Sequence, residues 1–473
     1  MQLSELIDRT PEVTVRATIN GVGGAAAEIH SLAIDSRHIR EGALFCCSPG
    51  EHSNGHDFAA QAVDSGAVAI LVDHVLSERR VPQVVVDSTR IAAGYLAATL
   101  SQRPSDHLRL VGITGTNGKT TTAHILQCAL NALGAPTGVI GTLTGKYTTP
   151  EAPELQSRLA EFVDSGMSAA AIEVSSHALA LDRVIGTHFA VGIFTNLGRD
   201  HLDLHGTQER YFAAKARLFT RSLCEHAVIN IDDVHGKLLV DAATIPTTAY
   251  SFADAADVVV APFEHAYSWR GQHVRVGLGG RFNVSNSLAA ATALSVLGYA
   301  PVDIAGALGK TTPVPGRFEP VVAGQDFVVI VDFAHTPDAL HEVLTAAREV
   351  ASVRRLIVVF GCGGDRDRSK RPEMGAIAAQ LADVCVLTSD NPRSEEPLAI
   401  MNDTIQGVPT SYRERVVMRQ DRREAIAYAL RESRPGDVVV IAGKGHETTQ
   451  TIQSTALAFD DRAVARNLLE SML

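Results

Sequence analysis

A glycine-rich turn between a buried strand and a helix constrains this chain more than any other feature. The apolar run that begins at Leu108, LRLVGITG, is typical of a buried strand, and a helical pattern follows from Lys119. Between them lies GITGTNGKT, residues 112–120, in which glycines let backbone N–H groups close around phosphate oxygens. Lys119 can reach the terminal phosphates of a nucleotide, and the Thr120 hydroxyl can bind Mg²⁺. Ile113 stands where the usual phosphate loop has its first glycine, but the flanking elements and the Lys-Thr pair still predict an ATP site.

Strand and helix patterns alternate along the whole chain, which predicts an α/β protein. Short apolar runs and turns up to about residue 104 predict a small α/β domain, which ends at a break near residues 103–105. A mostly parallel sheet covered by helices on both faces is predicted next, and after residues 313–316 the alternation restarts as a dinucleotide-fold-like (Rossmann-like) domain. A soft prior of roughly 150 residues per domain agrees with three domains. We therefore expect domains over residues 1–105, 106–315 and 316–473.

The same patterns predict individual elements within each domain. In the first two domains they predict strands at 67–72, 83–86, 169–174, 190–195 and 227–230, and a helix at 208–223. In the last domain they predict strands at 327–331, 356–360, 384–387 and 438–441, and helices at 337–351, 371–381 and 422–431.

Charge and composition exclude several classes of partner. A formal net charge of -11 and an aromatic content of only 5% disfavour a general nucleic-acid binder. The chain contains no run of ~18 apolar residues and no secretory leader at its start, so we expect a cytoplasmic protein without a membrane partner. The six cysteines form no C-x-x-C pair, and they indicate neither a disulfide framework nor a zinc site.

Several short motifs occur in an order that closely resembles the Mur ligases. They are TGTNGKTTT in the phosphate loop, EVSSHAL at 173–179, NLGRDHLDLHG at 196–206, YFAAKARLF at 211–219 and AGKGHE at 442–447. The resemblance extends from IDSR at 34–37 through VDFAHTPDAL at 331–340 and GCGGDRDRSKRP at 361–372. It is greatest to the members that add the third residue of the peptidoglycan stem peptide. It implies an amino-terminal UDP-muramoyl-binding domain, a central P-loop ATPase domain and a mobile carboxy-terminal domain that brings in the amino acid.

The reaction implied by this resemblance makes an amide from a carboxylate, which requires a better leaving group than oxide. ATP can supply one by phosphorylating the carboxylate to an acyl phosphate, which an amine then attacks. The implied substrates are ATP, meso-2,6-diaminopimelate and UDP-N-acetylmuramoyl-L-alanyl-D-glutamate. The resemblance thus implies an ADP-forming ligase, which we expect to be a monomer, in the synthesis of peptidoglycan precursors.

Four residues are the candidates for catalysis. Lys119 belongs to the phosphate loop, while Glu173 and His201 follow strand-like runs, at the carboxyl ends where α/β sheets place their ligands. Lys215 lies on a predicted helix, where a polar-face lysine is usually solvated, but it matches the family lysine that CO₂ converts to a carbamate. Such a carbamate offers hard oxygen atoms to Mg²⁺. The expected metal ligands are Thr120, Glu173, His201 and Lys215 as its carbamate.

The resemblance also assigns contacts to the nucleotide and to the acceptor. The expected ATP contacts are Gly115, Thr116, Asn117, Gly118, Lys119, Thr120, Thr121, Asn283, Asn286, Arg317 and Asp332. At a probable helix start the two asparagines could instead be caps, and Arg317 and Asp332 could form a hinge salt bridge. The expected contacts to the UDP-muramoyl peptide are Ser36, Thr148, Thr149, Ser175 and Arg183. Tyr147, Leu181 and the pair Cys46-Cys47 depart from the best-known family pattern near these positions.

The sequence DNPR at 390–393 predicts the choice of amino acid. An arginine after a strand, restrained by the preceding proline, offers a bidentate fork to a carboxylate. Family members that use meso-diaminopimelate carry DNPR here, whereas members that add lysine lack this pattern. The expected diaminopimelate contacts are Arg366, Asp390, Asn391, Pro392, Arg393, Gly443 and Glu447, with Glu447 available to the distal ammonium.

Three alternatives remain open from the sequence. The same ligase could add L-lysine or another diamino acid. The fold could serve other substrates, as in folylpolyglutamate or cyanophycin synthetases, although DNPR and TTPEAPEL at 148–155 argue against this. The chain could be a nucleotide switch without ligase activity, but the N-K-x-D motif with which switch GTPases read the base is missing.

Overall fold

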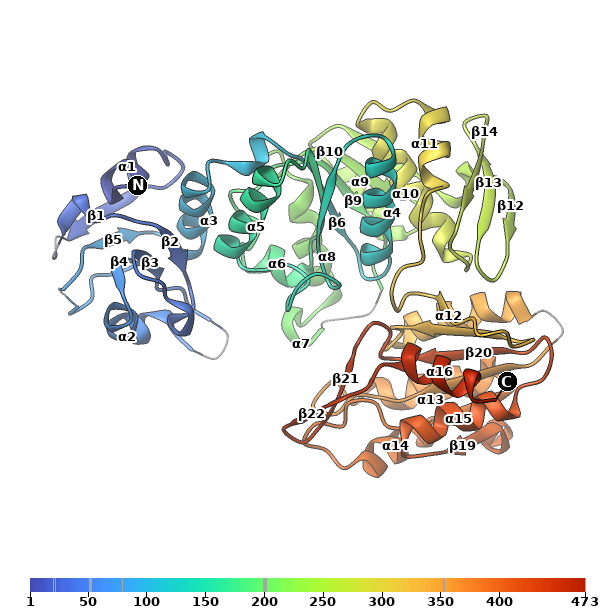
Figure 1. The fold of residues 1–473 in the computed structure, drawn as a ribbon. Helices are drawn as coiled ribbons and strands as arrows, with labels where there is room; N and C mark the ends of the chain where they lie inside the picture. The colour runs from blue at the N-terminus through green and yellow to red at the C-terminus, as the bar shows by residue number, and fades with distance from the viewer. Residues whose placement is uncertain are drawn as a thin grey trace.

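Three large sheets follow one another along the chain in the computed structural model (Figure 1). The structure describes residues 1–19, 21, 23–50, 53–78, 80–198, 202–351 and 354–472. Among these residues no helix is both long and apolar enough to cross a bilayer. The α/β class predicted from the alternating patterns is confirmed.

The amino-terminal unit is a five-stranded sheet in the order β1-β5-β4-β3-β2. Only the pairing of β1 with β5 is antiparallel. The strands are β1 Val15–Ile19, β2 Ser31–Ala33, β3 Ala43–Cys46, β4 Ala67–Val72 and β5 Gln83–Val86. Helices α1 (Leu3–Asp8) and α3 (Thr89–Leu100) cover one face, and α2 (Ala59–Asp64) covers the other.

The central unit is a six-stranded parallel sheet in the order β11-β10-β9-β6-β8-β7. Its strands are β6 Arg109–Thr114, β7 Thr137–Ile140, β8 Ala169–Glu173, β9 Phe189–Phe194, β10 Cys224–Asn230 and β11 Thr247–Tyr250. Side chains alternate along β6, so Val111 and Ile113 pack into the core beneath α4 and α10, while Leu110 packs beneath α5. The helices of this unit are α4 Lys119–Ala132, α5 Ala152–Asp164, α6 Ser176–Ala180, α7 Leu202–His205, α8 Gln208–Ala216, α9 Val234–Ala242, α10 Phe282–Val296 and α11 Pro301–Leu308.

The strand order places a topological switch at the carboxyl end of β6. From β6 the chain passes through α4 to β7, beyond β8, and β9 later pairs with the opposite edge of β6. Open α/β sheets bind ligands in the crevice that such a reversal creates. The glycine-rich turn lies at this position.

Two features of the central unit differ from the prediction. The helix predicted over 208–223 ends at Ala216, and a 3₁₀ turn, Arg217–Phe219, follows it and buries Leu218 and Phe219 against the sheet. A three-stranded antiparallel sheet, β12 (Ala256–Val260), β13 (His265–Trp269) and β14 (Gln272–Val276), was not predicted. Its second hairpin turns at Arg270 and Gly271, both with positive φ, and its apolar side chains cover α10.

The carboxy-terminal unit is a six-stranded sheet in the order β15-β16-β20-β17-β18-β19, in which only β15 is antiparallel. Its strands are β15 Glu319–Pro320, β16 Val328–Asp332, β17 Leu356–Phe360, β18 Val384–Leu387, β19 Val416–Met418 and β20 Val438–Ala442, with the hairpin β21 Thr449–Ile452 and β22 Thr455–Ala458 at one end. Its helices are α12 Pro337–Ala351, α13 Lys370–Leu381, α14 Pro397–Gln406, α15 Arg422–Glu432 and α16 Asp461–Glu470. The first three pack on one face of the sheet and the last two on the other.

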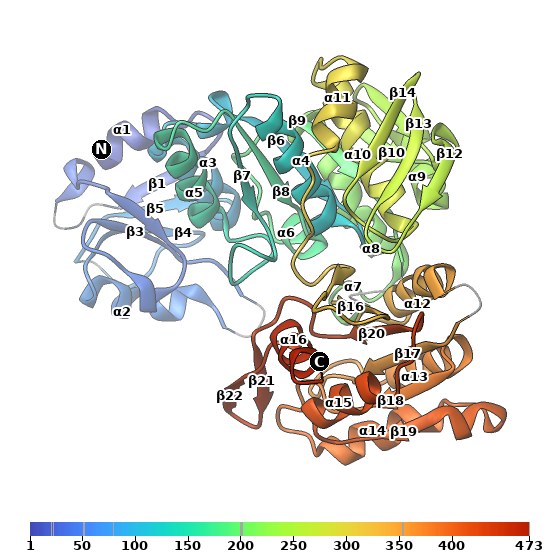
Figure 2. The ribbon, with the colours of Figure 1, turned by 45° about the vertical axis from the view of Figure 1, so that its right-hand side comes forward.

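The amino-terminal and carboxy-terminal units both adjoin the central one. The amino-terminal unit meets it where α3 packs against α5, and the carboxy-terminal unit lies below its phosphate-loop side in both views (Figures 1 and 2). The carboxyl end of β6 therefore faces a junction between the central and carboxy-terminal units.

Candidate active site

A cavity of about 550 Å³ occupies the junction between the central and carboxy-terminal units. From the central unit it is lined by the phosphate loop, by residues at the ends of β8, β9 and β10, and by parts of α8 and α10. From the carboxy-terminal unit it is lined by Arg317, residues 332–336 and one side of α12. A ligand in this cavity would contact both units at once.

The phosphate loop needs glycine at two positions. Gly115 has a φ of 150°, and a Cβ there would lie 1.8 Å from the Thr195 hydroxyl oxygen. Gly118 has a φ of 87°, and a Cβ there would lie 2.4 Å from Asn286 Oδ1. The Lys119 ammonium donates to the carbonyl oxygens of Gly115 and Thr116, each at 2.8 Å. The close packing of this loop holds the Lys119 charge at the amino end of α4, where a phosphate is best accommodated.

Glu173 brings a buried carboxylate to the same place from the end of β8. The Thr120 hydroxyl donates to Glu173 Oε2 at 2.9 Å. Thr142, a residue that the sequence analysis did not single out, donates its backbone N–H to Oε1 at 2.9 Å and its hydroxyl to Oε2 at 3.1 Å. The result is a group of hydroxyl and carboxylate oxygens beside the phosphate loop, which is the donor set that Mg²⁺ prefers.

Lys215 is buried, with 1% of its surface exposed. It is therefore not solvated, as a lysine on the polar face of a helix usually is. Its ammonium donates to Gly115 O at 2.8 Å and lies 4.5 Å from the centre of the Tyr211 ring. The Tyr211 hydroxyl is in turn 3.0 Å from Thr116 Oγ1. Helix α8 thus inserts a lysine among the phosphate-loop residues, next to Lys119. His201, the remaining catalytic candidate, lies outside the described residues.

The two asparagines of α10 do not cap its amino end. Asn283 donates to Gly279 O at 2.6 Å, and Asn286 donates to Asn283 Oδ1 at 2.9 Å. Asn286 lines the cavity, whereas Asn283 lies behind it and orients it. Thr121, also a predicted ATP contact, is a buried cavity residue on the first turn of α4.

Arg317 enters the cavity from the start of the carboxy-terminal unit. It is half-buried, donates to Thr120 Oγ1 at 3.3 Å, and lies over the Phe333 ring at 4.4 Å. Asp332 instead accepts the backbone N–H groups of Phe318 and Ala334, each at 2.7 Å, and burial raises the pKa of its carboxyl. Among the described residues Arg317 forms no ion pair, so a hinge salt bridge with Asp332 is absent.

The predicted acceptor residues fall into two places. Thr148 and Ser175 line the cavity beside Glu173. Thr149 lies just behind them, donating to Glu173 O at 2.7 Å, and Arg183 donates to Thr149 O at 3.3 Å. Ser36 lies apart in the amino-terminal unit, where its hydroxyl donates to Gln61 Oε1 at 3.4 Å. Thr149 and Arg183 therefore lie behind the wall of the cavity, and Ser36 does not line it.

The predicted diaminopimelate residues gather in the carboxy-terminal unit. Asn391 donates to Glu447 Oε2 at 2.9 Å, and the fully buried Lys444 donates to the same oxygen at 2.8 Å and to Asn391 Oδ1 at 3.2 Å. Burial alone would raise the pKa of the Glu447 carboxyl, but Lys444 lowers it below its ordinary value. Lys444 has no role in the sequence analysis, although it stands within AGKGHE. It keeps Glu447 ionised, so Glu447 can accept an ammonium.

Arg393 and its neighbours complete this group. Arg393 donates to Gly364 O at 2.7 Å and forms no ion pair with any described residue. Asp390 is buried, its carboxylate lies 3.8 Å from the Lys444 ammonium, and Gly443 packs beside it with a φ of 113°. Arg366 is exposed next to Gly363, while Pro392 is buried between Asn391 and Arg393. A guanidinium without an ion-pair partner among the described residues and the ionised Glu447 carboxylate thus both lie next to Asn391.

The predicted diaminopimelate contacts and the cavity at the phosphate loop meet at Gly316. A Cβ at Gly316 would lie 2.0 Å from the backbone nitrogen of His446, the neighbour of Glu447. The Phe333 ring contacts both the His446 ring, at a centroid distance of 5.1 Å, and Arg317. The two groups of predicted residues are therefore parts of one continuous arrangement.

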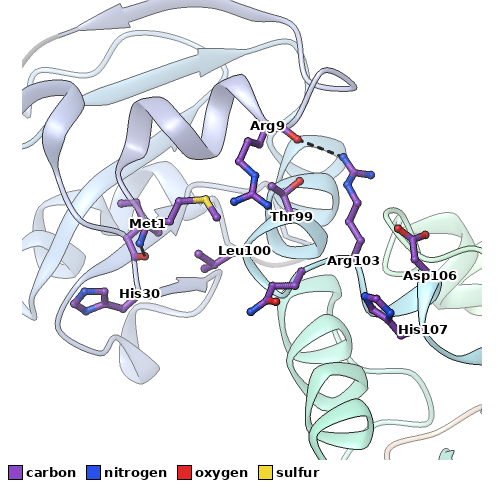
Figure 3. Close-up of a pocket in the computed structure, with 10 residues that line it drawn as sticks. Met1, Arg9, His30, Thr99, Leu100, Arg103, Asp106 and His107 are labelled. Carbon is purple, nitrogen blue, oxygen red and sulfur yellow. Dashed lines mark hydrogen bonds between the residues drawn. The ribbon is translucent and has the colours of Figure 1, made fainter. Parts of the chain in front are cut away.

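A second cavity, of about 710 Å³, lies between the amino-terminal and central units (Figure 3). Its two arginines already have acidic partners, since Arg9 pairs with Glu5 at 3.3 Å and Arg103 pairs with Glu12 at 2.9 Å. No residue predicted to bind a substrate lines it, and we assign it no ligand.

Comparisons with known proteins agree with this geometry. Three family models match the chain: "Mur ligase family, catalytic domain" over residues 28–99, "Mur ligase middle domain" over 113–294, and "Mur ligase, glutamate ligase domain" over 316–445. A UDP-N-acetylmuramoyl-L-alanyl-D-glutamate–2,6-diaminopimelate ligase of Syntrophomonas wolfei is 44% identical over 93% of this chain and 95% of the relative. The chain belongs to the Mur ligase family. The family resemblance seen in the sequence is thereby confirmed.

Further relatives of this Mur ligase carry the same name as the Syntrophomonas wolfei protein. One from Streptomyces avermitilis is 42% identical over 97% of this chain and 96% of its own length. A solved structure of a UDP-N-acetylmuramoyl-L-alanyl-D-glutamate–2,6-diaminopimelate ligase is 32% identical with a TM-score of 0.69, covering 100% of this chain and 99% of that one. A Mycobacterium tuberculosis folylpolyglutamate synthase, complexed with ADP and AMPPCP, shares the fold at 19% identity and a TM-score of 0.59, covering 75% of this chain and 92% of that one.

Proposed function

We propose that this Mur ligase joins meso-2,6-diaminopimelate to UDP-N-acetylmuramoyl-L-alanyl-D-glutamate in an ATP-dependent, ADP-forming reaction. Relatives that are 42% and 44% identical carry the name of this activity. The observation that carries the proposal is that two groups of predicted residues adjoin each other at Gly316. The phosphate loop and Glu173 lie on one side, and Arg393 and the ionised Glu447 lie on the other.

The proposed reaction has two steps. The free glutamyl carboxylate of the acceptor attacks the γ-phosphorus of ATP, ADP leaves, and an acyl phosphate forms. The amino group of diaminopimelate then attacks the acyl carbon, phosphate leaves, and the nitrogen loses a proton. Lys119 and Arg317 direct positive charge toward the transferred phosphoryl group, and the junction of the two units holds both reactants together.

The residues around Glu173 fit Mg²⁺ by their chemistry. Thr120 and Glu173 supply oxygen ligands 2.9 Å apart, and the proposed set is completed by His201 and by Lys215 as its carbamate. Mg²⁺ bound there would neutralise negative charge on the phosphoryl group as it passes between substrates. Glu173 is held in place for this role by its two hydrogen bonds from Thr142.

The carbamate proposal is supported by the surroundings of Lys215. Lys119 and Lys215 both donate to Gly115 O at 2.8 Å, so two ammonium groups share one carbonyl oxygen. Lys215 is buried and Lys119 is half-buried, and two like charges that share one carbonyl oxygen repel each other. CO₂ bound to Lys215 would convert one of them into an anion with metal-binding oxygens. The proposal therefore includes this carbamate alongside Mg²⁺.

The remaining expectations belong to the same proposal. Ser36, Thr148, Thr149, Ser175 and Arg183 would bind the UDP-muramoyl peptide, and residues 1–105, 106–315 and 316–473 would be the three functional domains. We propose a monomer that acts on small molecules, because one chain supplies all three groups of predicted residues. The proposed location is the cytoplasm.

Release of ADP by the purified protein tests the proposed activity. We expect ADP and a UDP-muramoyl tripeptide to form only when ATP, Mg²⁺, the UDP-muramoyl dipeptide and meso-diaminopimelate are all present. Mass spectrometry of the product identifies the added amino acid. Hydrolysis of ATP without either co-substrate, and no tripeptide, would instead fit a nucleotide switch. Faster ligation of L-lysine would fit the alternative amino acid.

Replacing Arg393 should separate the two amino acids. The distal carboxylate that distinguishes diaminopimelate from lysine would pair with the Arg393 guanidinium, and this pairing favours diaminopimelate by roughly 10²-fold. Arg393→Ala should therefore lower kcat/KM for meso-diaminopimelate by roughly that factor and barely change the slow rate with lysine. Both rates are measured for both proteins.

Two further variants control for indirect effects of this replacement. Arg393→Lys keeps a long side chain at this position, where φ is 51°, and removes the bidentate fork. Arg413→Ala removes an exposed arginine of the same unit and should change neither rate. An equal loss for both amino acids in Arg393→Ala and Arg393→Lys would contradict the assignment of Arg393.

A further inference from the structure

A cluster of two histidines and an aspartate lies in the amino-terminal unit, away from the cavity described above. Asp73 and His74 directly follow β4, and His56 lies in the 3₁₀ turn Gly55–Phe58 that precedes α2. The nitrogen and oxygen atoms that these three residues can offer to a metal ion all lie within 4.8 Å of one another. None of them belongs to the proposed ligase site.

The hydrogen bonds of Asn54 fix the state of the His56 ring. Asn54 Oδ1 accepts the backbone N–H of His56 at 3.2 Å, so this atom is the amide oxygen and not the amide nitrogen. The same oxygen lies 2.7 Å from His56 Nδ1, which must therefore carry the proton. In the neutral ring, His56 Nε2 then carries a lone pair and can only accept.

That lone pair faces a second acceptor. His56 Nε2 lies 3.1 Å from Asp73 Oδ1, and the backbone N–H of Asp73 reaches it only at 3.4 Å. Two atoms that carry lone pairs repel each other at this distance unless a cation lies between them. The His56 side chain is only 5% exposed, so solvent screens this contact poorly.

His74 brings a second nitrogen to the same carboxylate oxygen. His74 Nδ1 lies 2.5 Å from Asp73 Oδ1, and its ring stacks on the His56 ring at a centroid distance of 4.7 Å. Its side chain is 62% exposed, so the ring can adjust its position to a ligand. The basic neighbour Arg16 does not occupy Asp73 Oδ1, because it donates to the Asp73 backbone carbonyl and pairs with Asp87.

We propose that His56 Nε2, Asp73 Oδ1 and His74 Nδ1 form a binding site for a divalent transition-metal ion, with Zn²⁺ as the best match. Two imidazole nitrogens and one carboxylate suit Zn²⁺, whereas Mg²⁺ prefers oxygen ligands alone. A separation of 3.1 Å suits two ligands that each bind one ion at about 2.1 Å. The bond from His56 Nδ1 to Asn54 is the outer hydrogen bond that metal-binding histidines commonly make.

The site would connect two parts of the amino-terminal unit. It joins the end of β4 to the turn that leads into α2, and α2 carries Gln61, the hydrogen-bond partner of Ser36. An ion that binds only the folded protein stabilises it by mass action. Zn²⁺ would therefore stabilise the unit that carries the proposed uridine-nucleotide contact.

Titration of the metal-free, full-length protein with Zn²⁺ tests the proposal. Calorimetry is run with excess Mg²⁺ and a non-hydrolysable ATP analogue, which occupy the proposed ligase site. We expect one saturable Zn²⁺ site in the unmodified protein, and a rise in Tm when Zn²⁺ is added. His74→Ala and Asp73→Asn should weaken Zn²⁺ binding by at least roughly 10-fold and abolish the rise in Tm.

His30→Ala is the matched control variant. His30 lies in the same unit, is also 62% exposed and also contacts one carboxylate, that of Glu28 at 3.5 Å, but among the described residues it belongs to no comparable cluster. It should bind Zn²⁺ like the unmodified protein. If the unmodified protein shows no saturable binding, or if His74→Ala and Asp73→Asn bind as tightly as His30→Ala, the contacts of Asp73 are ordinary ion pairs and the proposal is overturned.

Discussion

Lys119→Ala is expected to lower the rate of ligation by on the order of 10³-fold while leaving the fold intact. The Lys119 ammonium lies at the amino end of α4, within the turn formed by Gly115 and Thr116. Its charge-assisted contact with the phosphates strengthens as the phosphoryl group moves, so its loss should cost several kcal/mol in the transition state. Tripeptide formation and thermal unfolding are measured on the purified variant.

Lys237→Ala provides the comparison for this experiment. Lys237 is an exposed lysine on α9 of the same unit, does not line the cavity and has no predicted role. Its replacement should leave both the rate and the Tm unchanged. Near-normal turnover by a folded Lys119→Ala protein would refute the ATP site proposed at the phosphate loop.

Lys215→Ala is expected to be nearly inactive, and added short-chain carboxylates should restore part of its activity. In the proposal, the carbamate presents carboxylate-like oxygens to Mg²⁺ beside Gly115. A small carboxylate can enter the space left by the shortened side chain and present similar oxygens. Recovery of the rate is measured against the concentration of added carboxylate.

Two measurements separate the carbamate from a merely structural lysine. Lys215→Met keeps much of the buried stem without the amine, so it should be inactive yet as stable as the unmodified protein, within about 1 kcal/mol. Electron density of an active crystal should show three additional atoms on Lys215. Full activity after exhaustive removal of CO₂, with an unmodified lysine in such a crystal, would rule the carbamate out.

Local patterns predicted the elements of the carboxy-terminal unit well. The helix predicted over 337–351 forms as α12, and the strand predicted over 356–360 forms as β17. In both cases the periodicity of apolar side chains matches the face that the sheet buries. The helix predicted over 208–223 was too long, because the burial of Leu218 and Phe219 against the central sheet favours a 3₁₀ turn over continued helix.

The unpredicted sheet of β12, β13 and β14 did leave a signal in the sequence. Polar and apolar residues alternate on both sides of the pair Arg270 and Gly271, which is typical of a two-residue hairpin turn. The antiparallel sheet completes the core beside α10.

The contacts between the predicted site residues were harder to predict than the residues themselves. Motifs pointed to Lys215, but only the fold brings it to Gly115, which lies 100 positions earlier in the chain. Lys444 reaches Asn391 over 53 positions and is buried completely. Such contacts depend on how the sheets are assembled, which the periodicity of single segments does not report.

The position of Arg317 directly after Gly316 couples two equilibria. Arg317 belongs to the segment that enters the carboxy-terminal unit, yet its guanidinium bonds to Thr120 of the phosphate loop. Any rotation of that unit about Gly316 moves this guanidinium relative to the nucleotide phosphates. An orientation that improves the contact therefore binds ATP more tightly, and by reciprocity ATP increases the population of that orientation. In the proposed function, the segment with Gly316 and Arg317 is thus part of the nucleotide site, and the free energy of ATP binding would help to position the carboxy-terminal unit.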